Sequence, residues 1–234
     1  MSALRRKLSV QTCILALALG FGSAASAQTA PGAAELAGYT GAFRAVVDND
    51  MASLRRELKD PKTLRQTDSN GRTPLHVATF LKRREIIREL IARKADTASL
   101  DRQKYDPVTI AAVADDPQTL KVLLENGASA KLITSVYDGT ALIAAAHLGH
   151  EECVRLLIEH GAPLDHVNNL GWTALMESIV LGDGGKRHQR TLDYLLKAGA
   201  NANIPDRQGA TPLAHARAKG YAAMIARLES SGAK

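Results

Sequence analysis

Histidine and cysteine are the residue types in this sequence that most often do chemistry, and their spacing decides whether they can do it here. The 234 residues contain seven histidines and two cysteines. A zinc site needs ligands at short, fixed spacings, and the sequence has no HExxH, CxxC or His-x-His pattern. Four of the histidines are scattered through different parts of the chain: His147, His166, His188 and His215. We therefore expect no metal site.

Other catalytic patterns are also missing from the sequence. No serine stands in a nucleophile elbow, and no cysteine–histidine pairing follows from spacing. The glycine-rich segment 182–185 lacks the Lys-Ser or Lys-Thr that a phosphate-binding loop requires after it. We therefore predict a protein that is not an enzyme and uses no cofactor. A solenoid-based enzyme or metal sensor remains the alternative, and a bound metal or a measured activity would support it.

The elements that hold these residues are pairs of short helices. In residues 140–168, an apolar run at 141–146, a break at 148–150 and an amphipathic run at 152–158 predict two helices joined by a tight turn. Each helix is shorter than the roughly 12–15 residues at which isolated helices become marginally stable in water. The pair must therefore bury its apolar faces against copies of itself.

Copies of this segment recur along most of the chain. The openings of the first helices, at Thr73, Asp106, Thr140, Thr173 and Thr211, are separated by 33, 34, 33 and 38 residues. The TPLH-type opening at 73–76, the Gly-His pair at 149–150 and the Gly-Ala endings resemble the ankyrin repeat family. This resemblance implies an all-α solenoid of about six helix-turn-helix units joined by hairpin-like loops. The units are expected at about 36–68, 69–101, 102–134, 135–168, 169–205 and 206–230.

Several local features of the repeats carry their own expectations. Thr73 is predicted to cap a helix that Pro74 begins, and glycines at 127, 161 and 199 end second helices in the left-handed conformation. Lys94 stands at the equivalent position of the second unit, which must be strained or end differently. His76, His150 and His160 are interpreted as structural, forming hydrogen bonds in turns and between repeats. The five residues added near 182–190 predict a longer loop with several cationic side chains.

The two ends of the chain are predicted to lie outside the repeats. Basic residues at 5–7, an apolar run at 13–21 and Ala-Ser-Ala at 25–27 predict a cleavable signal peptide over residues 1–27. Residues 28–35 are expected to be a flexible segment, the repeat domain to span 36–230, and residues 231–234 to be a mobile tail. We therefore expect an exported, periplasmic protein with no membrane insertion after cleavage; a secreted protein is the alternative.

The charge of the exported chain bears on its partners, and its cysteine content bears on disulfide formation. Loss of the signal lowers the net charge from +6 to +3, which does not favour nucleic acid as a partner. Cys153 is then the sole cysteine, so no intramolecular disulfide can form, and its place on the inner side of a second helix predicts burial.

The resemblance implies that the hairpin loops, or fingers, and the first helices bind protein partners. Four finger residues belong to types enriched in binding hot spots, and we expect them to form one edge of a partner site: Arg72, Tyr105, Tyr137 and Trp172. For Trp172, packing against a neighbouring finger is an equal alternative. The function predicted is a monomeric, non-enzymatic binding module of the bacterial envelope, acting as a scaffold or as an inhibitor or immunity protein. A secreted effector that binds a host protein is the alternative.

Overall fold

The computed structural model describes residues 29–234, so the predicted signal peptide lies outside the described residues. The chain divides by its contacts into residues 1–30 and residues 31–234, and the second unit holds all the repeats. Within the described residues, no helix is long and apolar enough to cross a membrane.

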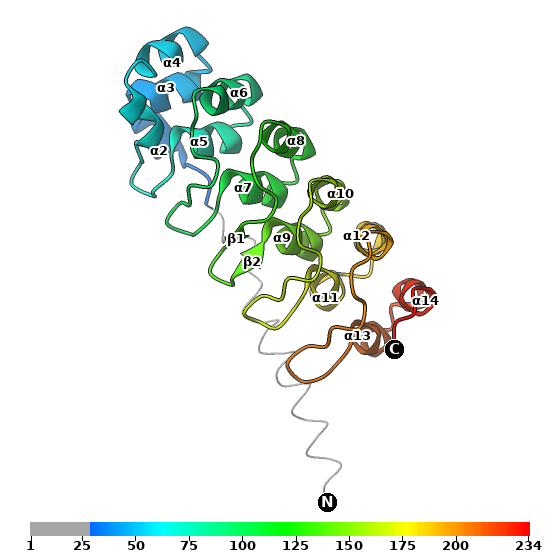
Figure 1. Cartoon of the computed structure of the whole chain (residues 1–234). Helices are drawn as coiled ribbons and strands as arrows, with labels where there is room; N and C mark the ends of the chain where they lie inside the picture. The colour runs from blue at the N-terminus through cyan, green and yellow to red at the C-terminus, as the bar shows by residue number, and fades with distance from the viewer. Residues whose placement is uncertain (1–28) are drawn as a thin grey trace, which may run out of the picture. The chain divides into compact units, whose positions relative to one another are not determined.

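Residues 31–234 are a stack of helix pairs that follow one another in sequence order (Figure 1). A short helix α2 (Ala33–Gly38) precedes the stack, and a 3-10 helix η2 (Pro61–Arg65) follows its first pair. The six pairs are α3 (Gly41–Asp48) and α4 (Met51–Glu57), α5 (Pro74–Phe80) and α6 (Arg84–Ala92), α7 (Pro107–Val113) and α8 (Pro117–Glu125), α9 (Ala141–Leu148) and α10 (Glu151–Glu159), α11 (Ala174–Val180) and α12 (Lys186–Lys197), and α13 (Pro212–Lys219) and α14 (Ala222–Ser230). The all-α solenoid of six units is confirmed.

One short pair of strands interrupts this helical pattern. Strand β1 (Ile133–Thr134) runs antiparallel to β2 (Gly139–Thr140), with Ile133 opposite Thr140 and Thr134 opposite Gly139. These strands form the two sides of a single finger loop, so they extend a connection between units and add no sheet to the core.

The first helices begin where side-chain oxygens accept hydrogen bonds from the first backbone amides. The Thr73 hydroxyl accepts from the amide of His76, and Thr140, Thr173 and Thr211 cap their own helices in the same way. In the third unit, Asp116 caps the helix that Pro117 begins, as the sequence predicts. These caps fix the start of the helices that carry them from local sequence alone.

Second helices end in the left-handed backbone conformation, and one of them does so without glycine. Gly127, Gly161 and Gly199 have φ values of 95°, 77° and 92°, whereas Lys94 has a φ of 70° at the equivalent position. A side chain in this conformation costs roughly 1–2 kcal/mol. The expected strain at Lys94 is therefore present.

The core runs the length of the stack between the two layers of helices. Ala78, Ala111, Ala145 and Ala216 are at most 1% exposed, so adjacent first helices approach closely, and Leu90, Leu123 and Leu157 fill the second layer. In the fifth unit Leu195 is fully buried and Leu196 is half-buried. Leu195 stands four residues before Gly199, the same spacing that Leu157 has to Gly161, so the register of the second helix is kept there.

Cys153 is fully buried on α10, as predicted. Burial, with smaller contributions from Asp115 and Asp116, raises the pKa of its thiol to about 12. The thiol is therefore protonated and inert at neutral pH, which confirms a packing role.

Parts of the two end segments contact the neighbouring units. Helix α2 begins at Ala33, inside the segment 28–35, and its Glu35 pairs with Arg72. At the other end, the Lys234 amide donates to Asn203 Oδ1 at 2.8 Å, and its carbonyl accepts from the Thr211 hydroxyl at 3.0 Å. Polar groups of the neighbouring units therefore bind to residues of both segments.

The five added residues of the fifth unit form a packed connection and an extra helical turn. The loop spans residues 181–185, because α12 already begins at Lys186 and runs for 12 residues. Tyr221 of the last unit donates to the Gly182 carbonyl at 2.9 Å. A Cβ atom on Gly182 would lie 2.0 Å from the Ser178 carbonyl oxygen, so only glycine fits there. The loop is therefore held between its neighbours.

Candidate functional site

The fingers are tight turns closed by one side chain each. Asp68 accepts hydrogen bonds from the amides of Asn70 and Arg72, at 2.8 and 2.9 Å. Asn168 makes the same pair of bonds to the amides of Leu170 and Trp172, both at 3.0 Å. Asp101 and Asp206 close the second and fifth fingers in this way, and the third finger is the β1–β2 hairpin. The residue four positions after the closing side chain, such as Arg72 or Trp172, is therefore placed by the same backbone geometry in each of these turns.

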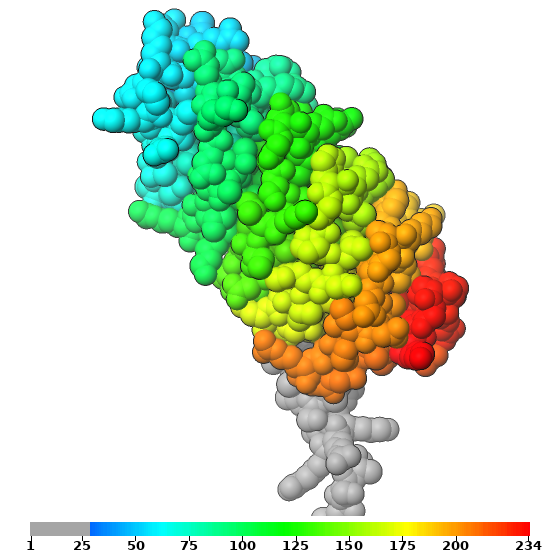
Figure 2. Space-filling model, in the orientation of Figure 1, coloured from blue at the N-terminus to red at the C-terminus, as the bar shows by residue number. Residues whose placement is uncertain are grey.

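Hydrogen bonds join each finger to the next. The amides of Arg102, Ser135 and Asn169 donate to carbonyl oxygens of the preceding fingers at 2.9, 2.8 and 2.9 Å; these belong to Asn70, Lys104 and Tyr137. At the last junction the guanidinium of Arg207 donates to the Asn169 carbonyl. The fingers form a continuous row along one edge of the stack (Figures 1 and 2).

Arg72 does not lie on the surface of this row. Its side chain is 1% exposed and donates to Asp68 at 2.7 Å and to Glu35 at 2.5 Å. The hydroxyl of Tyr39 donates to the same Asp68 carboxylate at 2.6 Å. Because the guanidinium is buried and bonded within this network, the expectation that Arg72 offers an exposed contact is wrong. We call residues 68–72 the sealed finger.

Tyr105 is also buried, with 7% of its surface exposed. Its carbonyl accepts from the Nε2 side of His76 at 3.2 Å. Burial, followed by the nearby hydroxyl of Tyr137 and the carboxylate of Asp101, raises the pKa of the Tyr105 hydroxyl. Tyr105 therefore offers no exposed contact, and that part of the expectation is also corrected.

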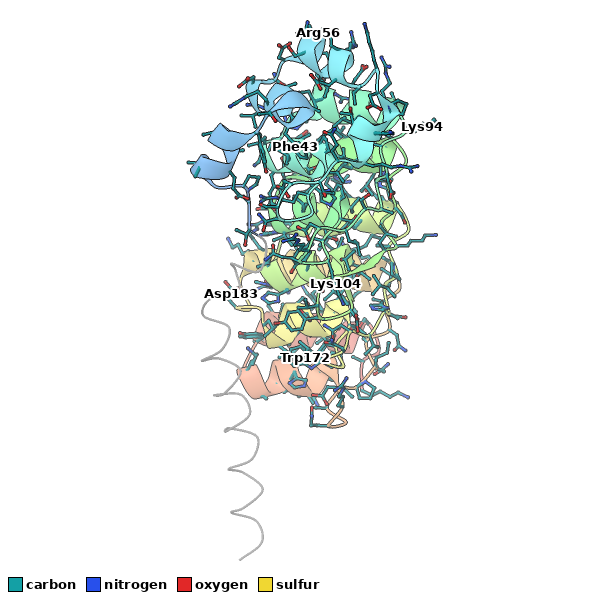
Figure 3. The ribbon with its side chains drawn as sticks, turned by 90° about the vertical axis from the view of Figure 1, so that its left-hand side faces the viewer. Phe43, Arg56, Lys94, Lys104, Trp172 and Asp183 are labelled. Carbon is teal, nitrogen blue, oxygen red and sulfur yellow. The ribbon has the colours of Figure 1, made fainter. Side chains whose placement is uncertain are left out.

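Tyr137 and Trp172 keep accessible surface. Tyr137 is 38% exposed in the loop between β1 and β2, and Trp172, which Figure 3 labels, is half-buried on the following finger. The Asn169 amide, which donates to the Tyr137 carbonyl, ties these two fingers together. The structure thus places two of the four predicted residues on adjacent exposed loops.

Further apolar side chains surround this pair. Ile133 is 56% exposed and Val136 57% on the β hairpin, and Val167 is 44% exposed at the base of the next finger. Contiguous exposed apolar surface on a soluble protein marks an interaction site more often than isolated residues do. We call residues 133–140 and 167–172 the display fingers. Sequence reasoning missed the three aliphatic residues, although their runs of β-branched residues beside a turn were visible.

A buried polar network holds the second display finger. Asn168 donates to Glu177 of α11 at 2.7 Å, and His147 of α9 lies 3.2 Å from the other oxygen of this carboxylate. Glu177 is 4% exposed. The network fixes the turn that carries Trp172. Sequence reasoning missed Glu177, although a glutamate stands there where three of the other openings carry an apolar residue: Val77, Ile110 and Ala144.

The remaining histidines are structural as far as their contacts show. His76 is fully buried, and burial lowers its pKa, which keeps its ring neutral. His150 bonds to the Ala112 carbonyl of the preceding unit at 2.9 Å, and His160 to the Leu156 carbonyl at 2.8 Å. These bonds confirm the predicted roles in turns and between repeats. Among the described residues, no group of three His, Cys, Asp or Glu side chains is placed to hold a metal ion.

The stacked helix pairs, the finger loops and their closing side chains define a helical repeat solenoid. The model of the family described as ankyrin repeats (3 copies) matches residues 42–134 and 108–206. The chain therefore belongs to the ankyrin repeat family, whose repeats are protein–protein interaction modules.

Relatives span bacteria and animals. The chain is 31% identical over 167 residues to the ankyrin repeat protein YahD of Escherichia coli (strain K12), covering 71% of this chain and 83% of YahD. It is 30% identical to the B-cell lymphoma 3 protein homolog of Mus musculus, over 81% of this chain but only 43% of that protein. A crystal structure of an ankyrin repeat domain from Acinetobacter baumannii AYE is 40% identical with a TM-score of 0.76, covering 82% of this chain and 97% of that one.

Proposed function

We propose that this chain is a non-enzymatic binding module of the bacterial envelope that holds a protein partner on its display fingers. Tyr137 and Trp172 contribute the aromatic contacts, and the aliphatic residues Ile133, Val136 and Val167 extend them. The observation that carries this proposal is the concentration of exposed apolar side chains on two adjacent fingers.

The finger architecture supports this use of the surface. Backbone bonds hold the turns, and the buried Asn168–Glu177 pair fixes the base of one of them. Preordered loops lose little conformational entropy when a partner binds, and more of the contact energy then appears as affinity. The partner is proposed to be a protein, and the binding module to be a monomer.

The place of action is proposed to be the periplasm, with a scaffold role or an inhibitor or immunity role. The signal pattern at residues 1–27 and the similarity to proteins of Escherichia coli and Acinetobacter baumannii support a bacterial exported protein. Cell fractionation followed by N-terminal sequencing tests this directly. We expect periplasmic protein that begins at Gln28; full-length protein retained in the cytoplasm would contradict it.

Site-specific crosslinking tests the binding surface. A photoreactive amino acid at position 136 should crosslink to one envelope protein, and the same group at Tyr194, on the second-helix layer, should not. The identified partner is then purified, and its affinity for the double variant Tyr137→Ser, Trp172→Ala is measured. Truncation of two central contacts should weaken binding at least about 30-fold, because hot-spot residues cost about 1–2 kcal/mol or more each. An unchanged affinity with a folded variant would refute this site.

A further inference from the structure

A second surface of different chemistry lies between the first two units. A groove of about 840 Å³ is bounded on one side by η2 and on the other by the end of α6 and the loop that follows it. Lys62, Arg65, Arg93 and Lys94 line it, together with Leu64 and Leu100. In Figure 3, Lys94 lies near the N-terminal end of the stack and Trp172 lies much nearer its C-terminal end. The groove is thus separate from the display fingers.

The groove has an excess of positive charge that its own surroundings do not neutralise. Within the described residues, Lys62, Arg65 and Lys94 make no ion pair, and Arg93 pairs with Glu89 at 3.2 Å. Asp96 is the single carboxylate in the lining, and it is occupied by the amide of Ala98 and the hydroxyl of Ser99, at 2.9 and 3.0 Å. The groove therefore attracts negative charge.

The wider charge distribution follows the same division. Residues 36–101 contain thirteen lysines and arginines against nine aspartates and glutamates, whereas residues 102–234 contain fourteen of each. The positive charge of the repeat domain is therefore concentrated in the two units that build the groove. A field of this kind increases the rate at which anionic partners reach the surface.

Lys94 stands in the groove at a conformational cost. Its left-handed backbone, with φ of 70°, is the conformation that glycine supplies in three other units. Glycine at this position would remove the strain and would also remove the ammonium group from the groove.

The lining also specifies the form of the ligand. Leu100 is 44% exposed, and Leu64 is half-buried against the core, so the cations surround an apolar floor. No aromatic side chain lines the groove on which a base could stack, which disfavours nucleic acid. We propose that the groove binds an extended acidic segment of a protein, with carboxylates on Lys62, Arg65 and Lys94 and an apolar side chain against Leu64 and Leu100.

Fluorescence anisotropy with a labelled peptide of alternating Glu and Leu tests this proposal on the purified protein. Binding should weaken as salt rises, because the exposed charges are screened beyond a Debye length of about 10 Å at 0.1 M. The triple variant Lys62→Gln, Arg65→Gln, Lys94→Gln should bind at least about fivefold more weakly, whereas Lys197→Gln should bind like the wild type. Tyr137→Ser should also leave this affinity unchanged, which separates the groove from the display fingers.

Lys94→Gly distinguishes a lost contact from a damaged fold. This variant should weaken peptide binding while raising the thermal midpoint by about 2–4 °C, because it removes both the charge and the strain. Equal binding of the triple variant and the wild type would overturn the proposal. Equal affinity for a Gln-Leu peptide would also overturn it, as would a short polyphosphate that binds as tightly as the acidic peptide.

Discussion

The first and fourth fingers share one backbone design and use it in opposite ways. Asp68 and Asn168 close equivalent turns, and Arg72 and Trp172 occupy the same position after those turns. In the sealed finger that side chain is almost completely buried in an ionic network, whereas in the display finger it remains half-exposed.

The difference comes from what lies in front of each finger. Helix α2 supplies Glu35 and Tyr39, which close the space over the sealed finger. The finger of Trp172 is instead preceded by the β hairpin, whose own apolar side chains are exposed. The position of a residue in the repeat therefore fixes where its backbone lies on the finger. Contacts from the preceding segment determine whether its side chain is buried or accessible to a partner.

The largest effect is expected from opening the sealed finger. Arg72→Ala leaves the carboxylate of Asp68 buried without its cation, and should lower the free energy of unfolding by about 3 kcal/mol. Urea denaturation measures this change. Arg102→Ala, at an exposed position on the next finger, is the control and should cost less than about 0.5 kcal/mol. A loss of under about 1 kcal/mol for Arg72→Ala would show that the network is not a structural seal.

The display finger should depend on its closing side chain to a smaller extent. Asn168→Ala removes the acceptor of two backbone amides and one partner of Glu177, which should cost about 2 kcal/mol. Asn169→Ala, the exposed neighbour, should cost less than about 1 kcal/mol. If the two variants unfold at the same urea concentration, Asn168 does not hold the turn.

Acid should distinguish the two fingers, because Asp68 titrates and Asn168 does not. Burial alone would raise the pKa of Asp68, but hydrogen bonds from Tyr39 and Arg72 lower it below 3.8. Its contribution to stability is therefore complete above pH 3.8 and disappears as the pH falls through the lower folded-state pKa. The free energies of unfolding of the wild type and of Asp68→Asn, measured by urea denaturation, should differ by about 1 kcal/mol at pH 6, and the difference should shrink as the pH falls below 3.8. A difference that stays constant over this range would mean that Asp68 is not ionised in the folded protein.

The smallest effect on stability is expected at Tyr137. Tyr137→Ser should change the free energy of unfolding by less than about 0.5 kcal/mol, because the ring is exposed and its backbone bonds remain. Thermal and urea unfolding measure this. A loss above about 2 kcal/mol would show that the ring packs within the stack, and the display fingers would then lose their central contact.

The sequence predicts the fold well because the repeat is encoded locally. Caps such as Thr73 and Asp116, and the strained end at Lys94, depend on residues within one turn of helix. The fifth unit is predicted less well, because half of the predicted loop is helical: α12 already begins at Lys186. Spacing shows that residues are added, but it does not show whether they lengthen a loop or a helix.

The candidate site is predicted less completely than the fold. Arg72 has the residue type of a binding hot spot, and its burial depends on Glu35, 37 residues earlier in a segment that the sequence suggests is flexible. Tyr105 is buried as well, and His76, 29 residues earlier in the sequence, bonds to its carbonyl. Whether a side chain is exposed depends on the neighbouring units, which residue type does not show. Of the four candidates chosen by residue type, Tyr137 and Trp172 retain accessible surface.

The links between finger tips also affect how this surface can evolve. At three junctions the contact joins one backbone to another, so almost any side chain can be substituted at the tip without uncoupling the row. New specificities can therefore be sampled there at little cost to folding. The last junction relies on the guanidinium of Arg207 instead. Tip residues in the middle of the row can therefore vary freely, whereas the junction at its C-terminal end requires arginine at position 207.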